Sequence, residues 1–169
     1  MPPDYYFCKN SRRLKKLSIL FLVAVIGISS CTTNGLFEKN VAIPNHAWDS
    51  RFQPTIQFDI SDTTSLYRIY IVLRHTDAYR FKNLWLNIGV QPPGDSIYVN
   101  RRNLLLASDE KGWLGKGMDD IFEHRLLLNE KPAPFRKKGT YTFTLKQLMR
   151  EDPLENMMNA GIRIEKVTE

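Results

Sequence analysis

The chain has 169 residues, 43% of them hydrophobic, and a formal net charge of +6. Its length is that of one ordinary domain with a real core. Residues 1–30 hold five of the 24 Lys and Arg and one of the 18 Asp and Glu, so the remainder carries only +2. Its basic residues are interspersed except at 101–102 and 136–138, whereas nucleic-acid binding needs a concentrated basic face. That class of function is therefore excluded.

The N-terminal segment, residues 1–30, is predicted to be a lipoprotein signal peptide. A basic cluster precedes an apolar run that ends in small residues, which is the layout of an export leader. Ile28-Ser-Ser-Cys31 resembles a bacterial lipobox, in which cleavage precedes the cysteine and its sulfur is acylated, for example with palmitate. The alternative is a transmembrane anchor, but the 14 residues from Leu17 to Ser30 fall short of the roughly 20 that a spanning helix needs.

Cleavage at this site determines which cysteine remains in the mature chain. Cys8 leaves with the leader, so Cys31 is the one cysteine of the mature chain and no intramolecular disulfide is expected. Lipid on the Cys31 sulfur also excludes it as a nucleophile or metal ligand. We predict residues 31–47 to be the lipidated N-terminus and tether, and residues 48–169 to be the folded domain.

Strand signatures recur from residue 54 onward. Apolar and polar residues alternate with period two in five segments, as in half-buried strands: 56–60, 67–73, 84–90, 140–145 and 162–164. Turn-forming residues separate the segments. Two further strands are predicted at 97–106 and 122–129, and one short helix at 146–158, where Pro153 interrupts the pattern.

These elements predict an all-β fold. We expect an antiparallel β-sandwich, jelly-roll-like, of about seven or eight strands, with the short helix near the C-terminus covering a sheet edge. A closed β-barrel is the alternative, because closure cannot be read from periodicity.

No constellation of catalytic residues is apparent. Nucleophile, zinc-protease and phosphate-loop motifs are absent from the sequence. His46, His75 and His124 lie in different segments without ligand spacing, so each is predicted to be a surface or structural imidazole. Asp119 and Asp120 are adjacent, which on a strand points them to opposite faces, and calcium is weakly supported there. We predict a non-enzyme with no cofactor and no metal.

Aromatic residues off the core parity are the candidates for recognition. Trp85 lies opposite in parity to Leu84, Leu86 and Ile88, so its ring belongs to the outer face of its strand. That face presents either a recognition patch or a surface covered by a loop. Trp113, between two glycines, is either a plug over one end of the sandwich or an exposed anchor.

The chain resembles the gliding-motility lipoprotein GldH family of Bacteroidota. The resemblance spans the mature chain and rests on the order of several elements behind the lipobox: Trp48, Phe58-x-Ile60-x-Asp62-Thr63, residues 67–84, Gly112-Trp-Leu-Gly-Lys-Gly117, residues 139–150 and Gly161-Ile-Arg-Ile-Glu165. One departure is visible, because Asn100-Arg-Arg-Asn103 stands where a strand with Asp-Thr is expected. Any partner-binding role of that acidic position is in doubt in this chain.

The resemblance implies a lipid-anchored envelope protein of the machinery for gliding and type IX secretion, without catalytic activity. Candidate partner-binding residues are Trp85, Trp113, Tyr98 and Arg74, and Arg74 is equally suited to a structural ion pair. The partners are the membrane, through lipid on Cys31, and other envelope proteins. Thr32-Thr-Asn-Gly has no Asp at the second mature position, which by analogy favours a periplasm-facing outer-membrane location.

A glycan-binding module is the alternative function. In this hypothesis Trp85, Trp113 and Tyr98 act as stacking platforms for a cell-wall sugar. It belongs to a different class from docking onto envelope proteins, and tryptophan fluorescence during titration with wall glycans distinguishes the two.

Overall fold

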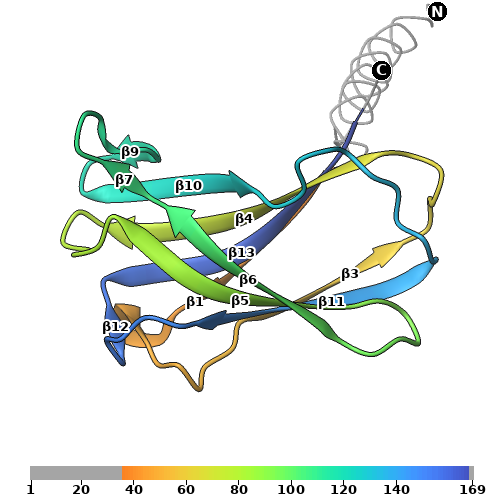
Figure 1. The fold of residues 1–169 in the computed structure, drawn as a ribbon, viewed down its shortest axis with the longest axis horizontal. Coiled ribbons are helices and arrows are strands. Elements are labelled where there is room, and N and C mark those ends of the chain that lie inside the picture. Colours follow the sequence, from red (N-terminus) through yellow and green to blue (C-terminus); the bar gives the residue numbers. More distant parts are fainter. Residues whose placement is uncertain (1–35, 168–169) are drawn as a thin grey trace, which may run out of the picture. The chain divides into compact units, whose positions relative to one another are not determined.

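Alternating apolar residues organise the described part of the chain, residues 36–167 of a computed structural model, into two facing antiparallel sheets (Figure 1). The five-stranded sheet has the order β1 (Leu36–Ala42), β13 (Met157–Lys166), β4 (Tyr67–Thr76), β10 (Ile121–Leu127), β9 (Lys116–Met118). The four-stranded sheet has the order β3 (Thr55–Ile60), β11 (Gly139–Gln147), β5 (Asn83–Gln91), β6 (Tyr98–Leu105).

Short elements cap the ends of the sandwich. β2 (Ala47–Trp48) pairs with β12 (Leu154–Glu155), and β7 (Ala107–Ser108) pairs with β8 (Gly112–Trp113). A 3-10 turn, η1 (Pro44–His46), follows β1. No helix within residues 36–167 is long and apolar enough to cross a membrane.

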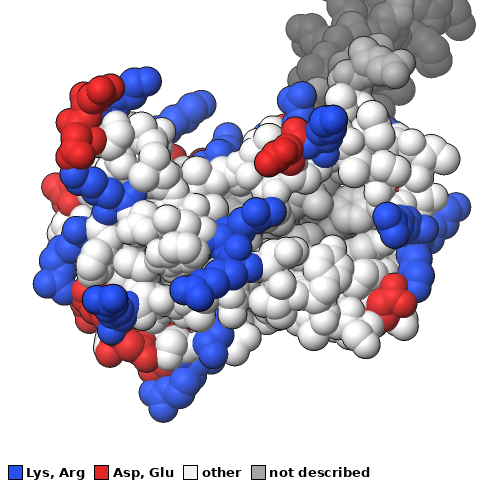
Figure 2. All heavy atoms as spheres, in the orientation of Figure 1, with Lys and Arg blue, Asp and Glu red and all other residues white. Residues whose placement is uncertain are grey.

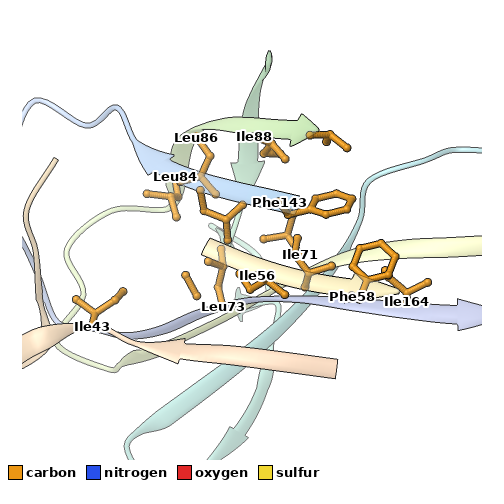
Figure 3. Close-up of a cluster of buried hydrophobic side chains, with 14 of the residues drawn as sticks. Ile43, Ile56, Phe58, Ile71, Leu73, Leu84, Leu86, Ile88, Phe143 and Ile164 are labelled. Atoms are coloured by element: carbon orange, nitrogen blue, oxygen red, sulfur yellow. The ribbon is translucent and has the colours of Figure 1, made fainter. Parts of the chain in front are cut away.

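The core lies between the two sheets and is built from one parity of each strand. Leu84, Leu86 and Ile88 of β5 are fully buried and face Ile71 and Leu73 of β4 across the interior (Figure 3). Burial of these aliphatic side chains removes apolar surface from water, the main favourable contribution to folding. The predicted strand faces are therefore confirmed.

The predicted all-β sandwich is confirmed in its class. The five strands predicted from alternation correspond to β3, β4, β5, β11 and β13, and the two further predicted strands to β6 and β10. The described residues contain 13 strands rather than seven or eight, because six additional segments, most of only two or three residues, also pair. Two- and three-residue strands are too short to give a period-two signal.

The helix predicted at 146–158 is wrong. β11 continues to Gln147, a turn follows, and β12 and β13 occupy the rest of the segment. Gln147 closes the turn, because its Oε1 accepts from Met149 N–H (2.7 Å) and its Nε2 donates to the Trp48 carbonyl (3.2 Å). Leu154 and Met157 are fully buried, so the apolar spacing attributed to a helix face serves two separate strands.

The strand β1 lies inside the segment predicted as a tether, residues 31–47. It pairs along its whole length with β13, from Leu36 opposite Glu165 to Ala42 opposite Asn159. Only Phe37 and Val41 of this strand pack against the core, so its sequence carries little apolar alternation. The order of β1 comes from backbone pairing with a strand far along the chain. The predicted tether boundary at residue 47 is thus too late.

Candidate functional site

The two sides of the sandwich differ in how the sheets meet. On one side β1 of the five-stranded sheet lies against β3 of the four-stranded sheet and closes the core. On the other side β6 is the edge of its sheet, and among residues 36–167 it pairs with β5 alone. The six residues from Tyr98 to Asn103 of β6 are all exposed, so this strand is uncovered on both of its faces.

Half of this second side is closed by aromatic residues. Trp113 of β8 packs on His75 of β4 with ring centroids 4.4 Å apart, and on Phe122 of β10 at 5.7 Å. Trp113 therefore plugs one end of the sandwich, the first of the two alternatives that its sequence context left open. Gly115 lies against His124, since a Cβ there would meet its Nε2 at 2.8 Å.

The other half of this side opens into a cavity of about 700 Å³. Its apolar lining comes from both sheets and from the segment between β10 and β11: Ile69, Val90, Leu128, Phe135, Tyr141 and Phe143. Tyr98, Asn100 and Arg102 of β6 form the opposite wall. Figure 2 shows a hollow on the face that β6 crosses, with basic groups in the middle of that face and at its margin.

The far wall of the cavity is held rigidly. Asn129 accepts from Ile69 N–H (2.8 Å) and donates to the Tyr67 carbonyl (2.9 Å), and Tyr67 and Ala133 exchange two backbone hydrogen bonds. Phe135, 8% exposed, packs on Tyr67 and on Phe58. The position of this wall is thus fixed by contacts within the fold itself.

Basic groups dominate the polar lining of this cavity. Lys137 pairs with Asp95 (Nζ to Oδ1, 2.6 Å). Within residues 36–167, neither Arg102 nor Arg136 has an acidic partner. A cavity with an apolar floor and two uncompensated guanidinium groups suits a ligand that is apolar along its body and carries negative charge.

The four candidate residues named from the sequence lie in four different places. Tyr98, 52% exposed, stands at the cavity. Trp85 lies on the outer face of the four-stranded sheet, where the Arg101 guanidinium sits 4.7 Å from the centroid of its ring. Trp113 is the internal plug. The three aromatic rings therefore do not form one common stacking surface for a sugar.

Arg74 lies on the outer face of the five-stranded sheet, in a chain of ion pairs. Its guanidinium contacts Glu123 at 2.6 Å, Glu123 contacts Arg125 at 2.9 Å, and Glu38 contacts Arg163 at 2.7 Å. Partial burial of Glu38 opposes its ionisation, but the hydrogen bond from Arg163 and the nearby charge of Arg125 prevail, so the pKa of Glu38 is lowered. These contacts give Arg74 a structural role, the second of its two predicted roles.

His75 and His124 come together although their sequence positions show no ligand spacing. Both are buried, and their Nε2 atoms lie 2.9 Å apart. Among residues 36–167 no group of three or more His, Cys, Asp or Glu side chains is placed to hold a metal ion. In the described part of the chain the two imidazoles contact each other in the core between β4 and β10.

Sequence reasoning missed most of the cavity. Of its lining only Tyr98 was a candidate, while Phe135, Leu128 and Arg136 were not. A signal was present, because Asn100-Arg-Arg-Asn103, the departure from the family pattern, lies on β6 at the open edge. Cys31, the predicted lipidation site, lies outside the described residues.

Comparison with known proteins gives a consistent family. The model of the GldH lipoprotein family matches residues 35–164. The gliding motility lipoprotein GldH of Flavobacterium johnsoniae is 28% identical over 91% of this chain and 98% of its own length. A GldH homolog of Christiangramia forsetii is 27% identical over 87% of this chain and 93% of its own length.

The similarity to solved structures is low. The VP2 subviral particle of infectious bursal disease virus aligns with 79% of this chain and 33% of its own, at 16% identity and a TM-score of 0.33.

Proposed function

This chain belongs to the GldH lipoprotein family, and we propose that it is a lipid-anchored, non-catalytic envelope protein of the gliding-motility and type IX secretion machinery that acts through protein contacts. The family match covers nearly the whole β-sandwich, from residue 35 to residue 164. A relative that aligns with this chain over 98% of the relative's own length bears the name gliding motility lipoprotein. The role in motility is carried over from that name.

Anchoring is supported by the lipobox that ends at Cys31. We propose that lipid on Cys31 holds the protein at the periplasmic face of the outer membrane, since Thr32-Thr-Asn-Gly carries no acidic retention signal. More than one acyl chain is needed for stable attachment, because a single chain binds a bilayer only marginally.

The observation that carries the mode of action is the open edge at β6. A cavity with an apolar floor and uncompensated arginines adjoins an exposed strand. Exposed apolar surface rimmed by polar groups marks interaction sites on proteins. By contrast, the buried polar side chains, His75, His124 and Gln147, are occupied in contacts within the fold. Docking onto another envelope protein therefore fits the surface better than catalysis.

A deletion strain tests the proposed function. We expect loss of colony spreading and reduced secretion of type IX cargo, both restored by the wild-type gene. Cys31→Ser should restore neither, because the unlipidated protein is not held at the membrane. Arg51→Met, an exposed change remote from the cavity, should restore both. Normal spreading and secretion in the deletion strain contradict the proposal.

A further inference from the structure

We propose that the free edge of β6 accepts an extended, alternating apolar and acidic segment of a partner protein, which adds as a fifth strand to the four-stranded sheet and covers the cavity. This inference deepens the proposed function by assigning the contact surface and the chemistry of the partner. It rests on that function only for the partner being an envelope protein.

The backbone of β6 offers free hydrogen-bonding groups along its outer edge. The N–H of Leu148, the residue after β11, donates to the Trp85 carbonyl. The backbone N–H and C=O groups of Trp85 therefore point toward β11 and away from β6. Trp85 and its partner Asn103 are thus a non-hydrogen-bonded pair of the antiparallel ladder. By alternation, the N–H and C=O groups of Val99, Arg101, Asn103 and Leu105 point to the free edge.

The edge at β6 differs from the other sheet edges in its length and its exposure. The edge strands β1 and β3 contact each other and close the other side of the sandwich, and β9 has three residues. β6 has eight residues, and apolar side chains along its margin are exposed: Ile97, Tyr98, Val99 and Leu105, at 49–56%. Asn100 to Asn103 between them are polar or basic, so the edge is long and exposed with apolar residues at both ends. A long exposed edge is the feature that pairs with another strand.

The cavity lies where the inward side chains of an added strand would go. Tyr98, Asn100 and Arg102 point inward and line the cavity, so residues opposite them on a new strand point inward as well. There they meet Ile69, Leu128 and the other apolar groups of the floor. Strand addition of this kind takes affinity from main-chain hydrogen bonds and specificity from pockets for alternate side chains.

Charge selects the partner. Arg101 faces outward, beside the outward side chains of an added strand, and Arg102 faces inward. Within residues 36–167 none of Arg101, Arg102 and Arg136 has an acidic partner. A second copy of this chain would place its own Arg101-Arg102 against the same pair, and like charges directly opposite are destabilising. An acidic segment of a different protein is therefore the occupant.

Synthetic peptides test the backbone pairing with the full-length lipoprotein in lipid nanodiscs. The probe is a seven-residue alternating Val and Glu peptide, and the control replaces Glu with Lys. We expect saturable binding of the Glu peptide and binding at least about tenfold weaker for the Lys peptide. Alternate residues of the peptide direct their backbone N–H groups toward β6 or away from it, and in an antiparallel arrangement the Glu residues direct theirs toward β6. N-methylation of the Glu residues should therefore abolish binding, whereas N-methylation of the Val residues should leave it intact.

Variants of β6 test the surface. Val99→Pro removes a donor at the free edge without removing a bond to β5, and an edge strand tolerates such a proline. We expect Val99→Pro to weaken the Glu peptide at least about tenfold, while Val99→Thr binds normally. Arg101→Glu, on the outward face that the Glu side chains share, should weaken it as well. Thermal unfolding of each variant verifies that the fold is retained.

Three results overturn strand addition: no saturable binding of the Glu peptide up to about 1 mM, equal losses from both methylated sets, or laurate binding in the cavity without peptide binding. The last assigns the cavity to an anionic amphiphile. These results leave the deletion phenotype untouched. Conversely, a deletion strain that spreads normally refutes the proposed function while the peptide measurements still decide the role of β6.

Discussion

His75 on β4 and His124 on β10 share a single hydrogen bond in the core, with their Nε2 atoms 2.9 Å apart. His75 Nδ1 lies 2.7 Å from the Thr76 carbonyl, so this nitrogen carries the proton of a neutral His75 ring and its Nε2 accepts from His124. Burial lowers the pKa of both imidazoles, and the neighbouring His75 contributes to lowering the pKa of His124 to about 4. Burial therefore favours the neutral form of both rings.

Acid should destabilise the protein through this pair. Because the unfolded chain binds protons near pH 6.5 and the folded pair does not, stability is complete above that pH and falls as the pH drops toward 4. We expect the free energy of unfolding to decrease by about 2 kcal/mol between pH 7.5 and pH 5, measured by urea unfolding. His124→Gln, which can still donate to His75, should reduce this slope. Equal slopes in the two proteins contradict the assignment.

The Glu38–Arg163 ion pair should contribute measurably to stability. The side chains are only 20% and 18% exposed, and their contact at 2.7 Å joins β1 to β13. Arg163→Met should lower the free energy of unfolding by about 1–2 kcal/mol, because it leaves Glu38 partly desolvated.

The Arg51–Asp49 pair is the matched control, since the Arg51 side chain is 89% exposed. Arg51→Met should change stability by less than about 0.5 kcal/mol. Equal effects of the two substitutions in urea unfolding would show that β1 is not held by this contact.

Gly161 should not tolerate a side chain. A Cβ at this position of β13 would meet the Asn40 Oδ1 at 2.0 Å and the Lys39 carbonyl oxygen at 2.5 Å, both on β1. Gly161→Ala should cost about 2–3 kcal/mol, because backbone of the neighbouring strand must shift. Gly112→Asn is the control, since its positive φ suits Asn and no atom lies within 4 Å. Similar melting temperatures for the two variants contradict this packing.

The two tryptophans near the open side should differ in their effect on stability. Trp113→Ala removes a ring packed on His75, Phe122 and Tyr79, and we expect a loss of about 3 kcal/mol. Trp85→Ala removes an outer-face ring under Arg101 and should cost about 1 kcal/mol or less. Urea unfolding followed by circular dichroism measures both. A larger loss for Trp85 would reverse the assignment of plug and surface ring.

Periodicity was a sound guide wherever a strand has one face in the core. Phe58 and Ile60 of β3, and Leu84 and Leu86 of β5, are buried as their alternation predicts. It failed where pairing with a distant strand replaces burial as the source of order, as in β1. It also failed at 146–158, because the spacing of apolar residues across two short strands and a turn imitates a helix face.

Residue order alone was enough for the all-β class, the inward faces of five strands, the near-neutral body and the predicted lipid site at Cys31. Each of these depends on local composition or on a short motif, which the linear order of residues contains in full. Three relationships became visible in the fold alone: Trp113 is a plug, His75 contacts His124, and β6 borders a cavity with Phe135 and Arg136. Those relationships join residues tens of positions apart, and they exist only after two sheets have paired and packed.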